Sequence, residues 1–269
     1  GEILKKAALM NGIDKGELIS PVLTFETINR FAKTMKSNVK RIPMDNKIGI
    51  DLDRTAENTG SRTKLIYLCN PNNPTGSIMA TDQLESFCKT MSKKTIVFVD
   101  EAYHEYVTHP DYRSMIDLVK KGHNVMVSRT ASKVHGLAGL RVGFAITTPE
   151  IAKRLESYLT DSLNIIGLRA AIASYQDERF QAHSVEQNNR AKKIVTSHLD
   201  NKGIEYLNSQ TNFIFIKTGM DITDFQPAME KNGVIVGRPF PPYNKWCRLS
   251  MAKPEEMENF NTGMDRVLG

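Results

Sequence analysis

Cysteine is scarce in this sequence: only Cys69, Cys88 and Cys247 occur, far apart, in a chain of 269 residues. An odd number of cysteines at such spacing fits neither a disulfide framework nor a metal-binding knuckle. Cys69 and Cys247 lie within apolar, strand-like runs, so we expect them to be small core residues. The cysteine content therefore excludes a small disulfide-stabilised scaffold and a thiolate metal site.

Long hydrophobic runs and a compact basic block are also missing. No apolar stretch is long enough to cross a membrane and no signal peptide is found, so we expect a cytoplasmic protein. The formal charge of +6 comes from 36 Lys and Arg residues that are spread along the whole chain. Because they do not alternate with aromatic residues in one segment, they indicate a solvated surface and exclude a nucleic-acid-binding stripe.

The remaining composition is that of an ordinary globular enzyme, with 40% hydrophobic and 25% charged residues. A chain of 269 residues can bury a sizeable core in one large domain or in two unequal ones. Gly1 leads directly into a helical pattern of apolar residues without a preceding strand. We therefore expect the sequence to begin part-way through a longer protein.

Short apolar runs alternate with amphipathic helical patterns over the first 150 residues or so. Strands that are apolar throughout and separated by helices are typical of a mostly parallel sheet that is covered on both faces, an α/β fold. We expect strands at 18–22, 39–44, 64–69, 95–99, 123–127 and 142–146, and helices at 2–11, 25–35 and 81–92.

The pattern changes after Pro149, where long helical stretches precede a smaller β-rich region. We place a domain boundary in the long helix near residue 178, which gives a large domain 1–177 and a small α+β domain 178–269. The expected helices are 150–159, 165–175, 177–200, 221–232 and 254–268, and the expected strands are 212–217, 234–237 and 247–251.

Three chemically rich loops follow three of the expected strands. They are residues 70–76 (NPNNPTG), 100–103 (DEAY) and 128–133 (SRTASK). Ligands of parallel sheets bind beyond the carboxyl ends of the strands, where these loops would meet. The sequence therefore predicts one site at this edge of the sheet.

Lys133 has the surroundings that a covalent cofactor lysine needs. It stands behind the hydroxyl side chains of Thr130 and Ser132 and is followed eight residues later by Arg141. Its amine can form an imine with an aldehyde cofactor while the hydroxyls and the guanidinium hold that cofactor's phosphate. The alternative is a solvated lysine in a loop rich in Ser and Thr.

Taken together, these motifs resemble the fold-type I pyridoxal-phosphate enzymes, specifically the class I/II aminotransferases. The lysine loop at 129–133 (RTASK) is most similar to the histidinol-phosphate aminotransferase-like branch. The similarity runs from residue 1 to the C-terminus. It implies bound pyridoxal 5'-phosphate, a mostly parallel sheet between helices, a smaller C-terminal domain and usually a homodimer. It also implies that the family's N-terminal segment, with its substrate-gating arm, is missing.

The resemblance assigns roles to the residues of the three loops. Lys133 would carry the cofactor and shuttle a proton, and Asp100 would pair with the pyridine nitrogen. Tyr103 and Asn73 would hydrogen-bond the phenolic oxygen, while Asn73 would also lie near the substrate. Without the resemblance, Asp100 could be a capping carboxylate and Asn73 a turn residue. The phosphate would be bound by Thr130, Ser132 and Arg141.

Three further residues complete the set that the resemblance implies. Phe25 would stack on the cofactor ring, although it could equally be a core residue. Arg248, in the run Trp246–Ser250, would bind the substrate α-carboxylate, and a charge within an apolar strand needs such a partner. Arg238 would add a second anion contact or would simply lie on the rim.

The predicted activity is transfer of an amino group between an amino acid, or a histidinol-phosphate-like amine, and a 2-oxo acid. A pyridoxal-phosphate decarboxylase or lyase on the same fold is the first alternative, and a catalytically silent truncated homologue is the second. The branch commonly continues past the carboxylate arginine with Gly-Thr, whereas residues 250–253 here are SMAK. The identity of the substrate is therefore left open, and no metal is expected.

Overall fold

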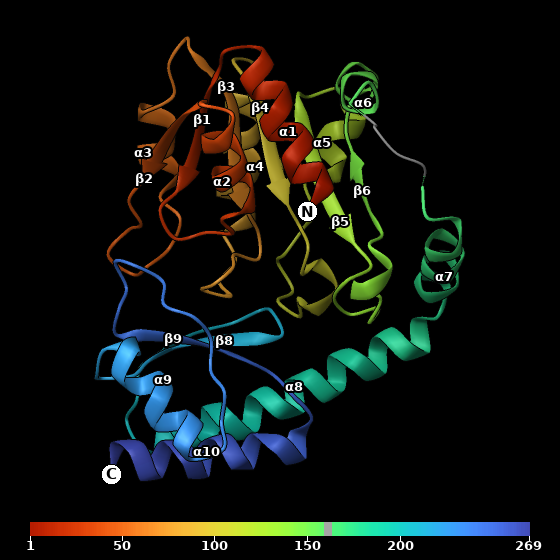
Figure 1. Cartoon of the computed structure of the whole chain (residues 1–269). Coiled ribbons are helices and arrows are strands. Elements are labelled where there is room, and N and C mark those ends of the chain that lie inside the picture. The colour runs from red at the N-terminus through yellow and green to blue at the C-terminus, as the bar shows by residue number, and fades with distance from the viewer. Residues whose placement is uncertain (159–162) are drawn as a thin grey trace.

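The computed structural model describes residues 1–158 and 163–269 and contains two sheets (Figure 1). The larger sheet has six strands in the order β2-β1-β3-β4-β5-β6, and the smaller one has the order β7-β8-β9. Strands β1 to β5 pair in parallel, while β6 runs antiparallel to β5. The predicted mostly parallel sheet is confirmed.

The strands of the larger sheet lie close to the predicted positions. They are β1 (Glu17–Pro21), β2 (Asn38–Ile42), β3 (Thr63–Cys69), β4 (Ile96–Asp100), β5 (Val125–Thr130) and β6 (Gly143–Ile146). The helices between them are α1 (Glu2–Ile13), α2 (Thr27–Thr34), α3 (Leu52–Glu57), α4 (Thr81–Met91), α5 (Ile116–Lys120) and α6 (Pro149–Glu156).

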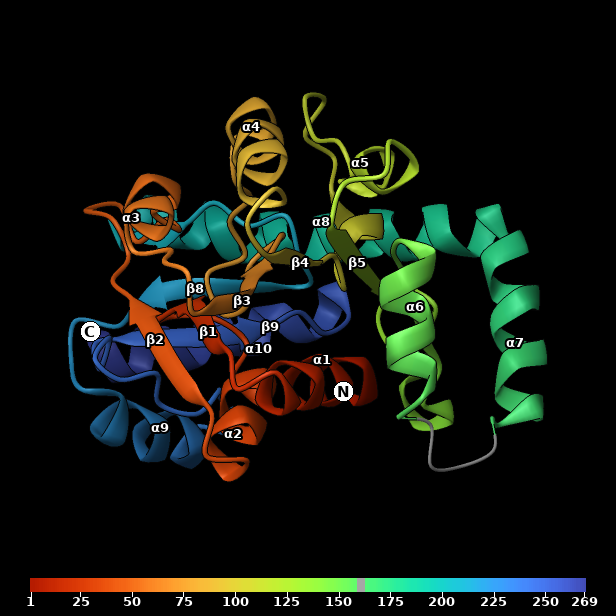
Figure 2. The same cartoon turned by 90° about the horizontal axis from the view of Figure 1, so that it is seen from above.

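Helices cover both faces of this sheet, as the view from above shows (Figure 2). Side chains alternate between the two faces of a strand, so the apolar run of β3 serves both layers. Leu65 and Tyr67 pack with α1 and α2, whereas Ile66 and Leu68 pack with α4. This burial on both sides explains why the strand sequences are apolar throughout.

The second half of the chain builds the smaller sheet and its helices. These elements are α7 (Ile165–Gln176), α8 (Glu178–Asn201), β7 (Tyr206–Leu207), β8 (Phe213–Lys217), α9 (Ile222–Lys231), β9 (Trp246–Ser250) and α10 (Pro254–Leu268). Apolar residues of α8, α9 and α10 form one core cluster with β8 and β9. The side chain of Asp177 accepts a hydrogen bond from Phe180 N, so residue 178 begins α8 instead of lying inside it. The division into domains 1–177 and 178–269 stays a prediction.

The predicted strand at 234–237 is wrong. The segment between α9 and β9 has no sheet partner, although its side chains alternate between the core and solvent, with Val236 buried and Ile235 86% exposed. The carbonyl of Gly237 accepts a hydrogen bond from Gln226 Nε2 at 2.7 Å, and Pro239 has no N–H to donate. The alternation of buried and exposed side chains here comes from packing against the core, and no backbone hydrogen bonds to another strand accompany it in the described structure.

The structure differs from the prediction in two smaller respects: where one helix ends, and the presence of three short elements that were not predicted. The predicted helix 150–159 is α6, which ends at Glu156, and position 159 lies outside the described residues. Short helices α3 and α5 and the two-residue β7 carry too few residues for a periodic pattern. Among the described helices, none has the length and apolar character needed to span a membrane.

Candidate active site

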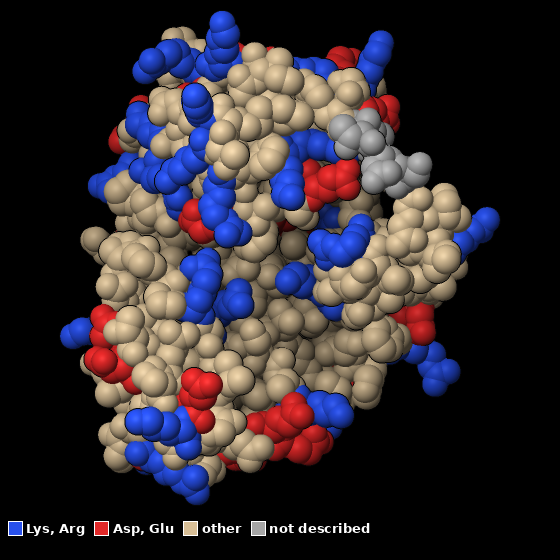
Figure 3. All heavy atoms as spheres, in the orientation of Figure 1, with Lys and Arg blue, Asp and Glu red and all other residues tan. Residues whose placement is uncertain are grey.

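A cavity of about 880 Å³ opens at the carboxyl ends of β3, β4 and β5. The space-filling view shows the molecule hollowed between its upper and lower parts, with Lys and Arg side chains around the hollow (Figure 3). The three strands are parallel neighbours in the sheet, so the loops that follow them meet at this edge, as the sequence predicted. Most of the candidate residues line the cavity, namely Phe25, Asn73, Asp100, Tyr103, Thr130, Ser132, Lys133 and Arg141.

Asp100 is the last residue of β4 and is buried at the base of the cavity. Ser128 Oγ donates a hydrogen bond to Oδ1 at 2.7 Å, and the Tyr67 hydroxyl donates to Oδ2 at 2.9 Å. Burial raises the pKa of Asp100, while these two hydrogen bonds oppose the rise. In the described part of the chain, no Lys, Arg or His forms an ion pair with it. A buried carboxylate without a protein cation suits a cationic group of a ligand.

Tyr67 and Ser128 were not among the sequence candidates. A tyrosine in a buried apolar run such as 65–69 needs a hydrogen-bond partner, so the position of Tyr67 in β3 indicates a polar contact there. Ser128 is paired in register with Asp100 across β4 and β5. These two hydroxyls hold both oxygens of the Asp100 carboxylate in place.

The Lys133 amine projects into the same cavity, and its Nζ lies 4.8 Å from the centre of the Tyr103 ring. Burial lowers the pKa of Lys133, and the nearby guanidinium of Arg248 lowers it further. A lowered pKa enlarges the neutral fraction of the amine near neutral pH. Lys133 therefore has the environment of a nucleophile or a general base.

A chain of hydrogen bonds connects Tyr103 to the smaller sheet. Asn73 Nδ2 donates to the Tyr103 hydroxyl at 3.2 Å, and an Arg248 terminal nitrogen (Nη1) donates to Asn73 Oδ1 at 2.9 Å. Burial raises the pKa of Tyr103, so the hydroxyl keeps its proton and can donate it to a ligand. Within the described structure, Arg248 Nε is buried without a hydrogen-bond partner. Arg248 thus reaches the edge of the site from β9, and its guanidinium keeps N–H donors that could bind a ligand.

The opposite end of the cavity collects groups that favour an anion. Thr130 Oγ1 lies 2.9 Å from Ser132 Oγ, and Arg141 lines the same wall. The first turn of α1 lies there too, and the free N–H groups at a helix N-terminus attract anions. Over residues 1–158 and 163–269, Arg141 has no carboxylate within ion-pair distance. The donor set fits a phosphate or a similar dianion.

The two remaining candidates occupy different environments. Phe25 is 37% exposed on the cavity wall, which excludes the alternative of a core residue. Arg238 is exposed, and its guanidinium lies over the Phe240 ring at 4.2 Å and donates to Pro239 O. Like Arg248, it does not line the cavity, and its exposure matches the rim alternative. No cluster of three or more His, Cys, Asp or Glu side chains that could hold a metal is found among the described residues.

The sequence model of the aminotransferase class I and II family matches residues 3–262. The chain belongs to this family. A relative from Hydrogenovibrio crunogenus, histidinol-phosphate aminotransferase 2, is 35% identical over 224 residues, which are 82% of this chain and 60% of the relative. The enzyme of the same name from Pasteurella multocida is 34% identical, covering 88% of this chain and 66% of the relative. The chain thus spans about three fifths to two thirds of these class I and II aminotransferases.

Solved structures of the family have the same fold. A protein from Erwinia carotovora atroseptica, provisionally named a histidinol-phosphate aminotransferase, superposes with a TM-score of 0.94 at 32% identity, over 98% of this chain and 78% of that one. A histidinol-phosphate aminotransferase from Sinorhizobium meliloti, solved with pyridoxal-5'-phosphate, gives a TM-score of 0.86 at 24% identity, over 97% and 74%. The predicted membership of the family and the predicted fold type I architecture are both confirmed.

Proposed function

We propose that this chain carries the catalytic residues of a pyridoxal-phosphate-dependent aminotransferase. It would move an amino group between an amino acid, or a histidinol-phosphate-like amine, and a 2-oxo acid. The observation that carries the proposal is the position of Lys133 in one cavity, with the buried carboxylate of Asp100 and an anion-binding wall. The names of the relatives support the same activity.

The residues present fit this cofactor. Thr130, Ser132 and Arg141 would hold its phosphate, and Asp100 would hold its ring nitrogen. In the described structure, the Asp100 carboxylate has no Lys, Arg or His as an ion-pair partner, so it is available to a cationic ligand group. Phe25 on the cavity wall would contact the ring face, and Asn73 and Tyr103 would hydrogen-bond the phenolic oxygen.

When bound, the cofactor supplies an electrophilic carbon and a protonated ring that withdraws electrons from the substrate. Lys133 Nζ would accept the proton that leaves the substrate Cα, because its lowered pKa enlarges the neutral fraction of the amine. Arg248 would bind the α-carboxylate through the donors that Asn73 does not use. Asp100 would hold the positive charge on the ring nitrogen throughout.

A screen of amino donors against the full-length protein tests the proposal. We expect a visible absorbance band when the cofactor is added, and loss of that band with formation of a 2-oxo acid when a suitable amino donor follows. Release of CO₂ or an elimination product without a 2-oxo acid would identify the decarboxylase or lyase alternative. Failure to bind the cofactor at all would leave the silent homologue.

Replacing Arg248 by alanine should weaken amino-acid and 2-oxo-acid binding alike. A charge-assisted contact is worth roughly 1.5–3 kcal/mol, so we expect KM to rise about 10- to 100-fold. Arg248→Lys should recover only part of the loss, because an ammonium cannot form the planar two-pronged contact. Steady-state kinetics and a separate cofactor titration measure both effects.

Arg238→Ala provides the comparison for Arg248→Ala, because Arg238 is exposed and donates to Pro239 O, whereas Arg248 donates to Asn73 in the site. We expect its KM effect to be several-fold smaller. Loss of cofactor affinity in Arg248→Ala with unchanged substrate KM would contradict the role given to Arg248.

We expect a cytoplasmic homodimer, with residues 1–177 as the cofactor domain and 178–269 as the smaller domain. Tight contacts join the two parts: Gly76 has a φ of +74°, and a Cβ there would lie 2.3 Å from Ser209 Oγ. Only glycine leaves room for this approach.

A further inference from the structure

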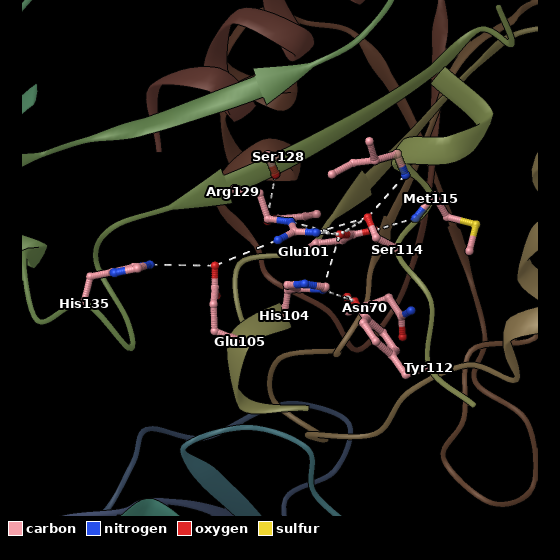
Figure 4. A network of polar contacts seen from close by, with 12 residues as sticks. Asn70, Glu101, His104, Glu105, Tyr112, Ser114, Met115, Ser128, Arg129 and His135 are labelled. Atoms are coloured by element: carbon pink, nitrogen blue, oxygen red, sulfur yellow. Dashed lines mark hydrogen bonds and ion pairs between the residues drawn. The ribbon is translucent and has the colours of Figure 1, made fainter. Parts of the chain in front are cut away.

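A buried polar network adjoins the candidate active site at the carboxyl ends of β4 and β5, and Figure 4 shows its side chains. Consecutive side chains of a strand point in opposite directions, so Arg129 in β5 points away from its neighbour Ser128. Glu101, directly after β4, meets the Arg129 guanidinium there. The main chains of the two segments are joined at this point, because Glu101 N donates to Ser128 O at 3.0 Å. Nothing in the proposed chemistry uses these two charges.

The Glu101 carboxylate is the central acceptor of the network. Its Oε2 accepts from Arg129 at 2.7 Å (Nη2) and 3.0 Å (Nε) and from Ser114 Oγ at 2.7 Å, and its Oε1 accepts from Met115 N at 2.9 Å. The Glu101 side chain is 1% exposed and that of Arg129 is 11% exposed. A buried pair with two donors on one carboxylate fixes orientation as well as distance.

On one side, the network reaches the end of β3. His104 Nδ1 lies 3.8 Å from Glu101 Oε2 and 3.4 Å from the Tyr112 hydroxyl. Tyr112 in turn donates to Asn70 O at 3.2 Å, and Asn70 begins the loop that carries Asn73. The ends of β3, β4 and β5 are therefore joined through side chains as well as through the sheet.

On the other side, the network approaches the loop that carries Lys133. Glu105 Oε1 lies 3.9 Å from an Arg129 terminal nitrogen (Nη1) and 3.9 Å from His135 Nε2, and Figure 4 shows these groups turned toward one another. His135 Nδ1 is 2.9 Å from Ser174 Oγ of α7. The loop around Lys133 is thus anchored at a point two residues beyond the lysine.

We propose that Glu101 and Arg129 are positioning residues for the reaction at Lys133. Their ion pair sets the spacing between the end of β4, which carries Asp100, and the end of β5, which leads through Thr130 to Lys133. Misplacement of reacting groups by about 1 Å costs on the order of 100-fold in rate. This inference rests on the proposed function, and the pair acts only through its neighbours.

Arg129→Lys tests the proposal, because it keeps the charge but removes the two-pronged contact to Glu101. We expect kcat to fall about 10- to 100-fold, with the amino-donor KM within about threefold of wild type, since Arg248 lies on β9. The control is Arg154→Lys, which makes the same change in an ion pair with Asp14 between α6 and α1. It should leave both constants unchanged.

A second measurement on cofactor-free protein separates this inference from the proposed function. Hydrogen exchange of peptides covering 128–136 should speed up at least threefold in Arg129→Lys and stay unchanged in Arg154→Lys. If Arg129→Lys does not fold, Glu101→Gln/Arg129→Gln replaces it, since removal of both charges leaves neither member of this ion pair buried without its partner.

Faster exchange together with a loss confined to kcat supports positioning. Unchanged exchange, kcat within twofold of wild type, or a loss that only follows the folded fraction would overturn it. A wild-type protein that binds no cofactor would refute the proposed function instead, while the exchange result would still report on the pair.

Discussion

Lys133→Ala is expected to abolish amino transfer, with a loss of at least about 10⁴-fold, because the nucleophile and the proton-transfer group are removed together. The cavity and the anion-binding wall remain, so some cofactor should still bind without a covalent bond. The visible absorbance band of wild type should be lost. Single-turnover measurements with an amino acid and the cofactor-loaded protein give the size of the loss.

Chemical labelling decides which lysine is involved. Borohydride reduction of the cofactor-loaded wild type, followed by peptide mass mapping, should place the pyridoxyl group on Lys133. The matched control is Lys192→Ala, which removes another partly buried lysine; burial lowers the pKa of Lys192 to about 8, and it donates to Ser209 O. This variant should be labelled at Lys133 like wild type. A label on any other lysine contradicts the assignment.

Asp100→Asn is expected to slow turnover by about 10²- to 10³-fold while the cofactor stays bound. An amide cannot balance the charge of a protonated ring nitrogen, and one preorganised electrostatic contact in a dry site is typically worth this much. Retention of the cofactor follows because its phosphate would be held by Thr130, Ser132 and Arg141. Absorbance spectra and single-turnover rates with one amino acid measure the two effects separately.

Tyr67→Phe serves as the control for Asp100→Asn. It removes one hydrogen bond to the carboxylate and keeps the charge, because Ser128 still donates to the other oxygen. A hydrogen bond to a charged group contributes at least about 1.5 kcal/mol, so we expect roughly a tenfold loss, smaller than that of Asp100→Asn. Near-normal turnover in Asp100→Asn would mean that the carboxylate is structural.

The parts of the site that lie on single loops could be predicted from the sequence. Parallel strands end at one edge of the sheet, so apolar runs followed by polar loops predicted that Asn73, Asp100 and Lys133 would come together. Thr130, Ser132 and Arg141 belong to the same short segment as the lysine, and the structure places them in the same cavity. Local order along the chain was enough, because the sheet converts it directly into spatial order.

Other features depend on packing between elements that are distant in sequence. The contact of Arg248 with Asn73 joins β9 to the loop after β3, and the sequence offered only a charge in an apolar strand. The exposure of Phe25 likewise depends on which elements cover it. Helical or strand periodicity in the sequence indicates which face of an element is buried, but it does not indicate which other element covers that face.

Backbone pairing and buried polar networks also required the tertiary structure. Residues 234–237 alternate like a strand, yet Gln226 occupies the carbonyl of Gly237 and no ladder forms. Glu101 and Arg129 appear in the sequence as ordinary members of the DEAY and RTASK motifs. In the folded chain these two side chains form an ion pair in the interior. A buried ion is stable only when a partner is supplied, and here that partner is 28 residues away in the sequence, so only the tertiary structure reveals the pair.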